Sequence, residues 1–179
     1  MSRFARSILL AGGLTIVLAI APPSSQCADG PAAAVQPTIQ KKSVTADAAL
    51  AIALIALKAA KDKGSQVAVA VVDQAGIPLV LLRTDYGTER SVGVATDKAW
   101  TAVNYKHSTR EVFEKVQQAK GDDSQLIHTP RSLFLFGGVP LKDGDVVVGG
   151  VGVSGFPSGL EDDAVAHEAA AAFEAMLRK

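Results

Sequence analysis

The amino-acid sequence predicts an α+β domain built on an antiparallel five-stranded sheet, with the element order α-β-β-α-α-β-β-β-α. Two observations favour this class. Short apolar runs follow one another across tight polar turns, as neighbouring antiparallel strands do. Alanine-rich segments with helical periodicity stand at both ends of these runs and between them. We therefore expect helices that pack on one face of the sheet.

The first 34 residues have the composition of a secretory signal peptide and its cleavage region. Arg3 and Arg6 precede an uncharged, mostly apolar stretch over residues 8–21, and prolines and small residues follow. This stretch is short for a membrane-spanning helix, which needs about 20 residues. We expect an exported protein, periplasmic or extracellular, with a flexible leader over residues 35–42 and a single domain over residues 43–179.

The composition argues against several partners and chemistries. The 179 residues carry 18 basic and 18 acidic side chains, so no excess of positive charge indicates a nucleic-acid partner. The one cysteine, Cys27, lies in the cleavage region. We therefore expect no disulfide, thiolate metal site or cysteine nucleophile in the mature domain, and no membrane span.

The first half of the domain predicts a helix, two strands and a second helix. Thr45 can cap a helix that runs to about Lys63, because leucines recur within it at helical spacing. Apolar strands over residues 67–72 and 77–82 flank an Asp-Gln-Ala-Gly turn. The second helix is expected over residues 89–105.

The second half predicts two helices and three strands. Ser108 and Ser158 each begin a capping-box pattern, so each is expected to start a helix. A short strand over residues 133–136 leads to a hairpin with Asp143-Gly144 at its turn. The last strand, residues 146–153, is apolar on both faces, and we expect it at the centre of the sheet.

Three glycines, Gly149, Gly150 and Gly152, interrupt this central strand. Because glycine weakens a strand, they indicate that something packs closely against the strand backbone. A helix, a second subunit or a ligand would each explain them, and the sequence leaves these alternatives open. If a ligand is the cause, the mouth of its cleft is expected where the strand ends at Ser154.

Several segments together resemble the GlcG/HbpS-like family of haem-binding and haem-degrading proteins, which includes the C-terminal domain of PduO-type proteins. They lie within residues 43–177 and are Val69-Ala-Val-Val-Asp73 with Gly76, Leu82-Arg-Thr-Asp85, Asp97-Lys-Ala-Trp-Thr-Ala102, Gly137-Gly-Val-Pro140, and Gly149–Gly155 with Asp162. The resemblance implies a profilin-like sheet, homo-oligomers from dimers to octamers, and, for exported members, extracellular binding of haem as a cofactor. It implies no settled reaction, so catalysis stays open.

Charged side chains are the first candidates for a ligand site. Arg83, Lys98 and Arg131 could bind a carboxylate such as a haem propionate, because basic side chains, and arginine above all, hydrogen-bond carboxylates. The alternative for each is a structural ion pair. The other candidates for the same site are Asp85, Thr101, Gly138, Gly152, Ser154 and Asp162.

The three histidines are too far apart in sequence to form a local metal motif. His107 and His128 are candidate ligands of haem iron, because histidine holds haem iron in many proteins. His167 is expected at the surface or at an interface. An oxygen ligand, from Thr101 or Tyr105, is the alternative to histidine.

The sequence thus predicts an exported, oligomeric haem-binding protein that buffers haem and iron or promotes haem breakdown. One alternative is a protein that binds another small molecule, or partners a sensor, through the glycine-lined cleft. Another is an enzyme that acts on a small hydroxy acid or a corrinoid-related ligand. A haem absorption band would support the first hypothesis. Thermal stabilisation by a small anion would support the second, and product formation would support the third.

Overall fold

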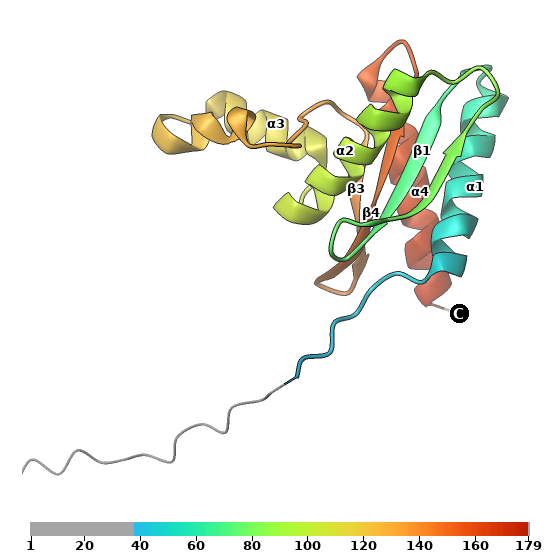
Figure 1. Ribbon diagram of the computed structural model, residues 1–179, viewed down its shortest axis with the longest axis horizontal. Coiled ribbons are helices and arrows are strands. Elements are labelled where there is room, and N and C mark those ends of the chain that lie inside the picture. Colours follow the sequence, from blue (N-terminus) through green and yellow to red (C-terminus); the bar gives the residue numbers. More distant parts are fainter. Residues whose placement is uncertain (1–37, 179) are drawn as a thin grey trace, which may run out of the picture. The chain divides into compact units, whose positions relative to one another are not determined.

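The computed structural model describes residues 38–178, so the predicted signal peptide and Cys27 lie outside the described residues. The compact unit that begins at Gln40 is an α+β domain, as predicted (Figure 1). Its elements are α1 (Ala46–Asp62), β1 (Ala68–Asp73), β2 (Pro78–Arg83), α2 (Glu89–Tyr105), α3 (Thr109–Gln118), the 3-10 helix η1 (Gly121–His128), β3 (Gly138–Asp143), β4 (Val146–Ser154) and α4 (Gly159–Leu177). Within residues 38–178, no helix combines the length and the apolar composition needed to cross a membrane.

Side-chain caps fix the helix starts that the sequence predicts. The hydroxyl of Thr45 accepts a hydrogen bond from the backbone N–H of Ala48 at 3.2 Å. Ser108 and Glu111 form a complete capping box at the start of α3. Ser158 also caps α4, but its hydroxyl accepts from Leu160 N instead of forming the expected capping box.

The four strands form one antiparallel sheet in the order β2-β1-β4-β3. β4 lies between β1 and β3, which confirms the prediction of a central, buried strand. β2 is an edge strand, and it begins with Pro78. Proline lacks the N–H group that a central strand would need, so the edge is where it can be accommodated.

The prediction of a fifth strand over residues 133–136 is wrong. The backbone N–H of Leu133 donates to the Thr101 hydroxyl of α2 (3.0 Å) and not to a neighbouring strand. The two phenylalanines of the segment pack edge-to-face against Tyr105 and Phe113. A run of four apolar residues is too short for its periodicity to distinguish a strand from a segment that packs on helices. Here the aromatic contacts hold the segment against the helices.

Helices cover both faces of the sheet, so the expectation that they cover one face is also wrong (Figure 1). α1 and α4 pack on the face that carries Val69 and Val71. α2 packs on the opposite face, over Ala68, Ala70 and Val72. β1 is therefore buried on both faces, which explains why its sequence is continuously apolar.

Two of the three glycines of β4 allow α2 to lie close to the sheet. A Cβ atom at Gly150 would lie 2.7 Å from the carbonyl oxygen of Ala99, and one at Gly152 would overlap the carbonyl oxygen of Ala95. Of the three explanations that the sequence leaves open, the packed helix accounts for Gly150 and Gly152, whereas a Cβ atom at Gly149 would meet the carbonyl oxygen of Val72 and the side chain of Val44.

Candidate functional site

A cavity of about 620 Å³ opens where β4 ends and where α2 and α4 begin. We call it the α2–α4 cleft. Its floor is formed by Lys98 and Asp162, and phenylalanines from α3 and from the segments before β3 and after β4 form one wall. The cavity has the size of small-molecule and cofactor sites, which measure about 300–1,000 Å³.

A buried ion pair between Lys98 and Asp162 forms the floor. Lys98 Nζ donates to Asp162 Oδ2 (2.8 Å) and to the carbonyl oxygen of Val153 (2.8 Å), and the two side chains are 2% and 6% exposed. Asp162 Oδ1 accepts from the backbone N–H of Phe156 (3.2 Å). A Cβ atom at Gly137 would lie 2.7 Å from the Asp162 Cβ, so glycine makes room for the pair.

Burial alters the proton affinities of both partners. Desolvation lowers the pKa of Lys98 and raises the pKa of Asp162, while their mutual attraction and hydrogen bond oppose both shifts. An ammonium group has three N–H bonds, and Lys98 directs two of them to Asp162 and Val153. The third N–H has no partner among the described residues, and the Lys98 side chain is only 2% exposed.

Arg90 lies at the mouth of the cleft, in the first turn of α2. It forms no hydrogen bond or ion pair with any residue between 38 and 178. The N-terminal turn of α4 borders the same cleft. Two helix N-termini and an unpaired guanidinium make this mouth favourable for an anion, above all a carboxylate.

One wall of the cleft is aromatic. It is formed by Phe113 of α3 together with Phe134, Phe136 and Phe156. The rings of Phe113 and Phe136 meet edge-to-face, with their centroids 5.4 Å apart. The cleft therefore offers an apolar surface to the body of a ligand and a cationic mouth to its acidic groups.

The structure brings three of the predicted site residues into the cleft: Lys98, Ser154 and Asp162. Sequence reasoning missed Arg90, Tyr86 and the aromatic wall. Arg90 had a detectable signal, because a positive charge in the first turn of a helix opposes the helix dipole and therefore requires another reason. The wall had none, since its phenylalanines come from segments that are distant in sequence.

Arg83 and Asp85 lie in the loop between β2 and α2. Arg83 Nη1 donates to the carbonyl oxygens of Asp85 (3.1 Å) and Gly87 (2.7 Å). Arg83 thus holds the loop in its conformation, and neither Arg83 nor Asp85 lines the cleft in the described part of the chain.

The other predicted residues lie at helix contacts. The Thr101 hydroxyl donates to Asp97 O (2.7 Å) and accepts from the segment before β3. Gly138 and Gly152 lie beneath α2, where a Cβ atom would overlap the helix backbone. Arg131 stacks on Trp100, with its guanidinium carbon 4.9 Å from the ring centroid.

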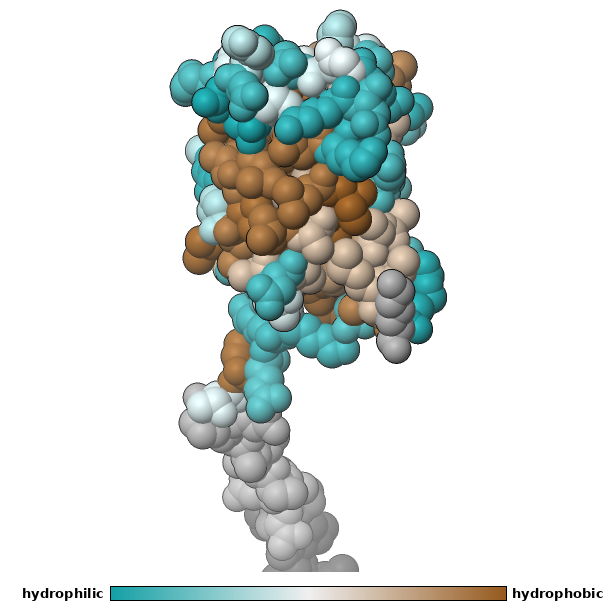
Figure 2. Space-filling model, turned by 90° about the vertical axis from the view of Figure 1, so that its right-hand side faces the viewer, coloured by the Kyte–Doolittle hydropathy of each residue, from teal (hydrophilic) through white to brown (hydrophobic). Residues whose placement is uncertain are grey.

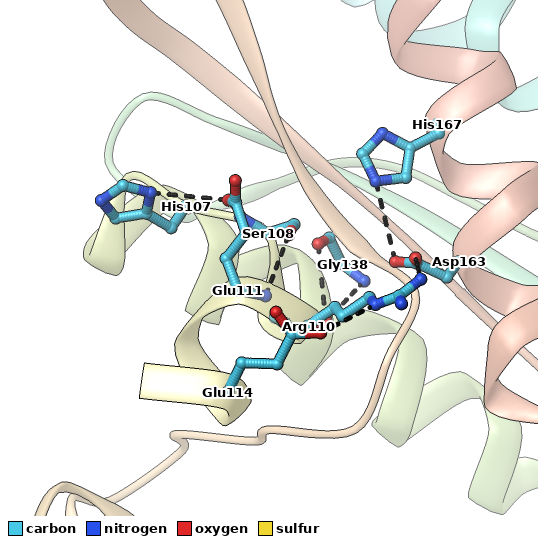
Figure 3. Close-up of polar contacts among 9 residues, drawn as sticks. His107, Ser108, Arg110, Glu111, Glu114, Gly138, Asp163 and His167 are labelled. Carbon is cyan, nitrogen blue, oxygen red and sulfur yellow. Dashed lines mark hydrogen bonds and ion pairs between the residues drawn. The ribbon is translucent and has the colours of Figure 1, made fainter. Parts of the chain in front are cut away.

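None of the three histidines lines the cleft within residues 38–178. His107 Nε2 lies 3.0 Å from Lys115 Nζ. Its Nδ1 lies 3.5 Å from a carboxylate oxygen of Glu111 (Figure 3). His128 is exposed at the end of η1. Among the described residues, no group of three or more histidine, cysteine, aspartate or glutamate side chains could hold a metal ion.

His167 and Arg110 flank the buried carboxylate of Asp163 (Figure 3). His167 Nε2 lies 3.8 Å from Asp163 Oδ1, and Arg110 Nη1 lies 3.7 Å from Oδ2. The Arg110 contact connects α3 to α4, whereas the His167 contact lies within α4. His167 is 55% exposed, in agreement with the surface position that the sequence predicts.

The family model described as haem degrading protein HbpS-like matches residues 44–171. Among curated proteins, the chain is 35% identical over 86 residues to an uncharacterised 15.0 kDa protein from the dhaT-dhaS intergenic region of Citrobacter freundii. That alignment covers 48% of this chain and 61% of the relative, so it spans less than two thirds of that protein.

Solved structures with the same fold include a double mutant of Streptomyces reticuli HbpS, with a TM-score of 0.71 and 38% identity over 81% of this chain and 97% of that chain. Klebsiella pneumoniae protein ORFY has a TM-score of 0.72 and 30% identity, and the match covers 80% and 99% of the two chains. A PduOC:heme complex has a TM-score of 0.65 and 27% identity, with 73% and 94% covered.

Proposed function

Because the chain belongs to the HbpS-like family of haem-degrading proteins, we propose that it binds haem in the α2–α4 cleft. The observation that carries this proposal is that one cavity of about 620 Å³ has both an aromatic wall and an arginine without an ion pair among the described residues. Haem has the matching chemistry, because its macrocycle is flat and apolar while its two propionates are anionic. A related structure, the PduOC:heme complex, contains haem.

The residues of the cleft fit haem in the following way. Arg90 would pair with a propionate, and the phenylalanines would contact the macrocycle. The free N–H of Lys98 would donate to an oxygen atom of the ligand. Bound haem would supply the redox chemistry of its iron, so buffering follows from binding alone, whereas haem breakdown also requires an open iron position for oxygen.

We also propose that the protein acts after export and as a homo-oligomer. The predicted signal peptide supports export. Figure 2 shows a hydrophobic patch on the side of the domain where α1 and β2 lie. The exposed apolar side chains of these two elements include Leu50 and Leu54 of α1 and Leu79 and Leu81 of β2. An exposed patch on an edge strand and a neighbouring helix suits contact with a second copy of the chain.

Titration of the purified protein with ferric haem tests the binding proposal. We expect an absorption band that saturates at one haem per chain. Light scattering on the same samples is expected to give a mass of at least two chains at micromolar concentration. Absorption that rises without saturation would contradict haem binding, and a monomer mass would contradict the oligomer.

A small carboxylate, such as a hydroxy acid, is the second candidate ligand. The observation that favours it is the third N–H of Lys98, which lies on the buried floor and has no partner among the described residues. Thermal unfolding in the presence of short hydroxy acids distinguishes the two ligands. A rise in Tm with a hydroxy acid, combined with no saturable haem band, would replace the first candidate with the second.

A further inference from the structure

Tyr86 is an aromatic side chain with no partner at the mouth of the cleft. It is 82% exposed, and it lines the cleft beside the start of α2. Neither its hydroxyl nor its ring makes a hydrogen bond or a ring contact within residues 38–178. When a tyrosine packs in a fold, its ring is normally buried and its hydroxyl is hydrogen-bonded. Tyr86 has neither feature, so packing of the domain does not explain why a tyrosine stands at this position.

The backbone on either side of Tyr86 is nevertheless fixed. Arg83 donates to the carbonyl oxygens of Asp85 and Gly87, the residues immediately before and after Tyr86. The Thr84 hydroxyl bonds to the backbone just before β1, and Gly87 N donates to Thr84 O at 2.9 Å. The loop is thus held at both ends, and the side chain of Tyr86 stays free at the cavity.

The other groups of the cleft that could bind iron are hydrogen-bonded to neighbours or are weaker ligands. Lys98 and Asp162 pair with each other, and the hydroxyls of Thr88 and Ser91 lie within 2.9 Å of each other. No histidine, methionine or cysteine lines the cleft in the described part of the chain. Ser154 offers an aliphatic hydroxyl, which is a far weaker ligand of ferric iron than a phenolate.

We propose that the phenolic oxygen of Tyr86 is the protein ligand of the haem iron in the cleft. This inference rests on the proposed haem binding. Tyrosine holds haem iron in some proteins, so the chemistry has precedent. As the oxygen binds ferric iron, the phenol releases its proton to solvent and the iron keeps its oxidation state. The assignment leaves no role as iron ligand for His107 or His128, which lie outside the cleft.

The variant Tyr86→Phe tests the inference, because it keeps the ring and removes the oxygen. Ferric haem is titrated into the purified unmodified protein and the variant, and absorption and resonance Raman spectra are recorded. We expect the unmodified complex to show phenolate vibrations and a phenolate-to-iron charge-transfer band. In Tyr86→Phe both signals are expected to disappear, and haem affinity to fall by more than about tenfold.

Tyr105→Phe is the matched control, because the Tyr105 hydroxyl bonds to Ser132 (2.9 Å) and the residue does not line the cleft. It is expected to keep the phenolate signals. An unchanged spectrum in Tyr86→Phe would overturn the inference and leave haem binding intact, and loss of the iron ligand in His107→Ala or His128→Ala would assign it to imidazole. If the unmodified protein gives no saturable band, both proposals fail.

Discussion

Lys98 and Asp162 are each costly to bury alone, and each compensates for the other. Their side chains are almost inaccessible, and each is satisfied by its partner and by a backbone group. A buried pair of this kind adds little net stability compared with apolar residues, but the loss of one partner leaves an uncompensated charge. The pair therefore makes more sense as the polar floor of a ligand site than as a source of stability.

Replacement of Lys98 by methionine tests this account of the pair. Lys98→Met is expected to lower the free energy of unfolding by about 3–5 kcal/mol, because Asp162 loses its partner. The double variant Lys98→Met with Asp162→Leu is expected to recover most of that loss. Guanidinium unfolding followed by circular dichroism gives these free energies.

Lys58→Met is the control, since Lys58 forms an exposed ion pair with Asp62 and its loss should change stability little. Equal losses in Lys58→Met and Lys98→Met would show that burial does not set the value of the Lys98 pair.

The start of α3 is held by the capping box of Ser108 and Glu111 and by a bond from Gly138 N to the Thr109 hydroxyl (3.0 Å). One turn later, the same helix carries Phe113 into the wall of the cleft. A local signal that is readable in the sequence thus positions a wall residue that the sequence does not reveal. The cap is expected to contribute about 1 kcal/mol to stability.

The capping box also predicts a pH dependence. Partial burial raises the pKa of Glu111, but hydrogen bonds from Ser108 and the charge of His107 outweigh this effect and hold the pKa below its usual value of 4.5. Because the folded-state pKa is the lower one, Glu111 contributes stability above the unfolded-state pKa. That contribution is lost as the pH falls through the folded-state pKa.

Glu111→Gln is therefore expected to lose less stability than the unmodified protein when the pH falls from neutral to below about 4.5. Urea unfolding across this pH range measures the difference. Glu114→Gln is the matched control, since Glu114 pairs only with the exposed Arg110 one turn earlier. If Glu111→Gln and the unmodified protein show parallel pH profiles, the capping carboxylate is not the cause.

Most elements could be predicted from the sequence because their signals are local. Caps, helical periodicity and the Asp143-Gly144 turn each lie within a few residues, and the structure has a helix start or a hairpin at each of them. The prediction of a strand over residues 133–136 is wrong because the conformation of this segment depends on aromatic partners from α2 and α3, which are distant in sequence. The sequence does not predict helices on both faces of the sheet, because the composition of an alanine-rich helix does not indicate on which face of the sheet it packs.

The candidate site could be predicted only in part, for the same physical reason. Lys98, Ser154 and Asp162 were identified, and they meet because β4, α2 and α4 converge at one end of the sheet. The charge of Arg83 makes it a candidate for anion binding, yet its guanidinium donates to backbone carbonyl oxygens two and four residues away. Charge alone does not show whether a side chain is already satisfied within the fold.

At the scale of the whole domain, helices enclose the sheet on both faces (Figure 1). The cleft lies where β4 ends and where α2 and α4 begin. Two helix N-termini, a central strand end and a phenylalanine of α3 meet there. The hydrophobic patch on α1 and β2 is built from other residues than those that line the cleft. The two proposals therefore place the ligand and a second copy of the chain on separate surfaces.

The haem affinity of Arg90→Ala tests most directly whether haem binds in the α2–α4 cleft. Arg131→Ala is the matched control, because Arg131 is half exposed but stacks on Trp100 and does not line the cleft. We predict that Arg90→Ala weakens haem binding by about tenfold, as expected for the loss of a charge-assisted hydrogen bond, and that Arg131→Ala binds as the unmodified protein does. Equal haem affinity in all three proteins would contradict the account and place haem elsewhere on the molecule.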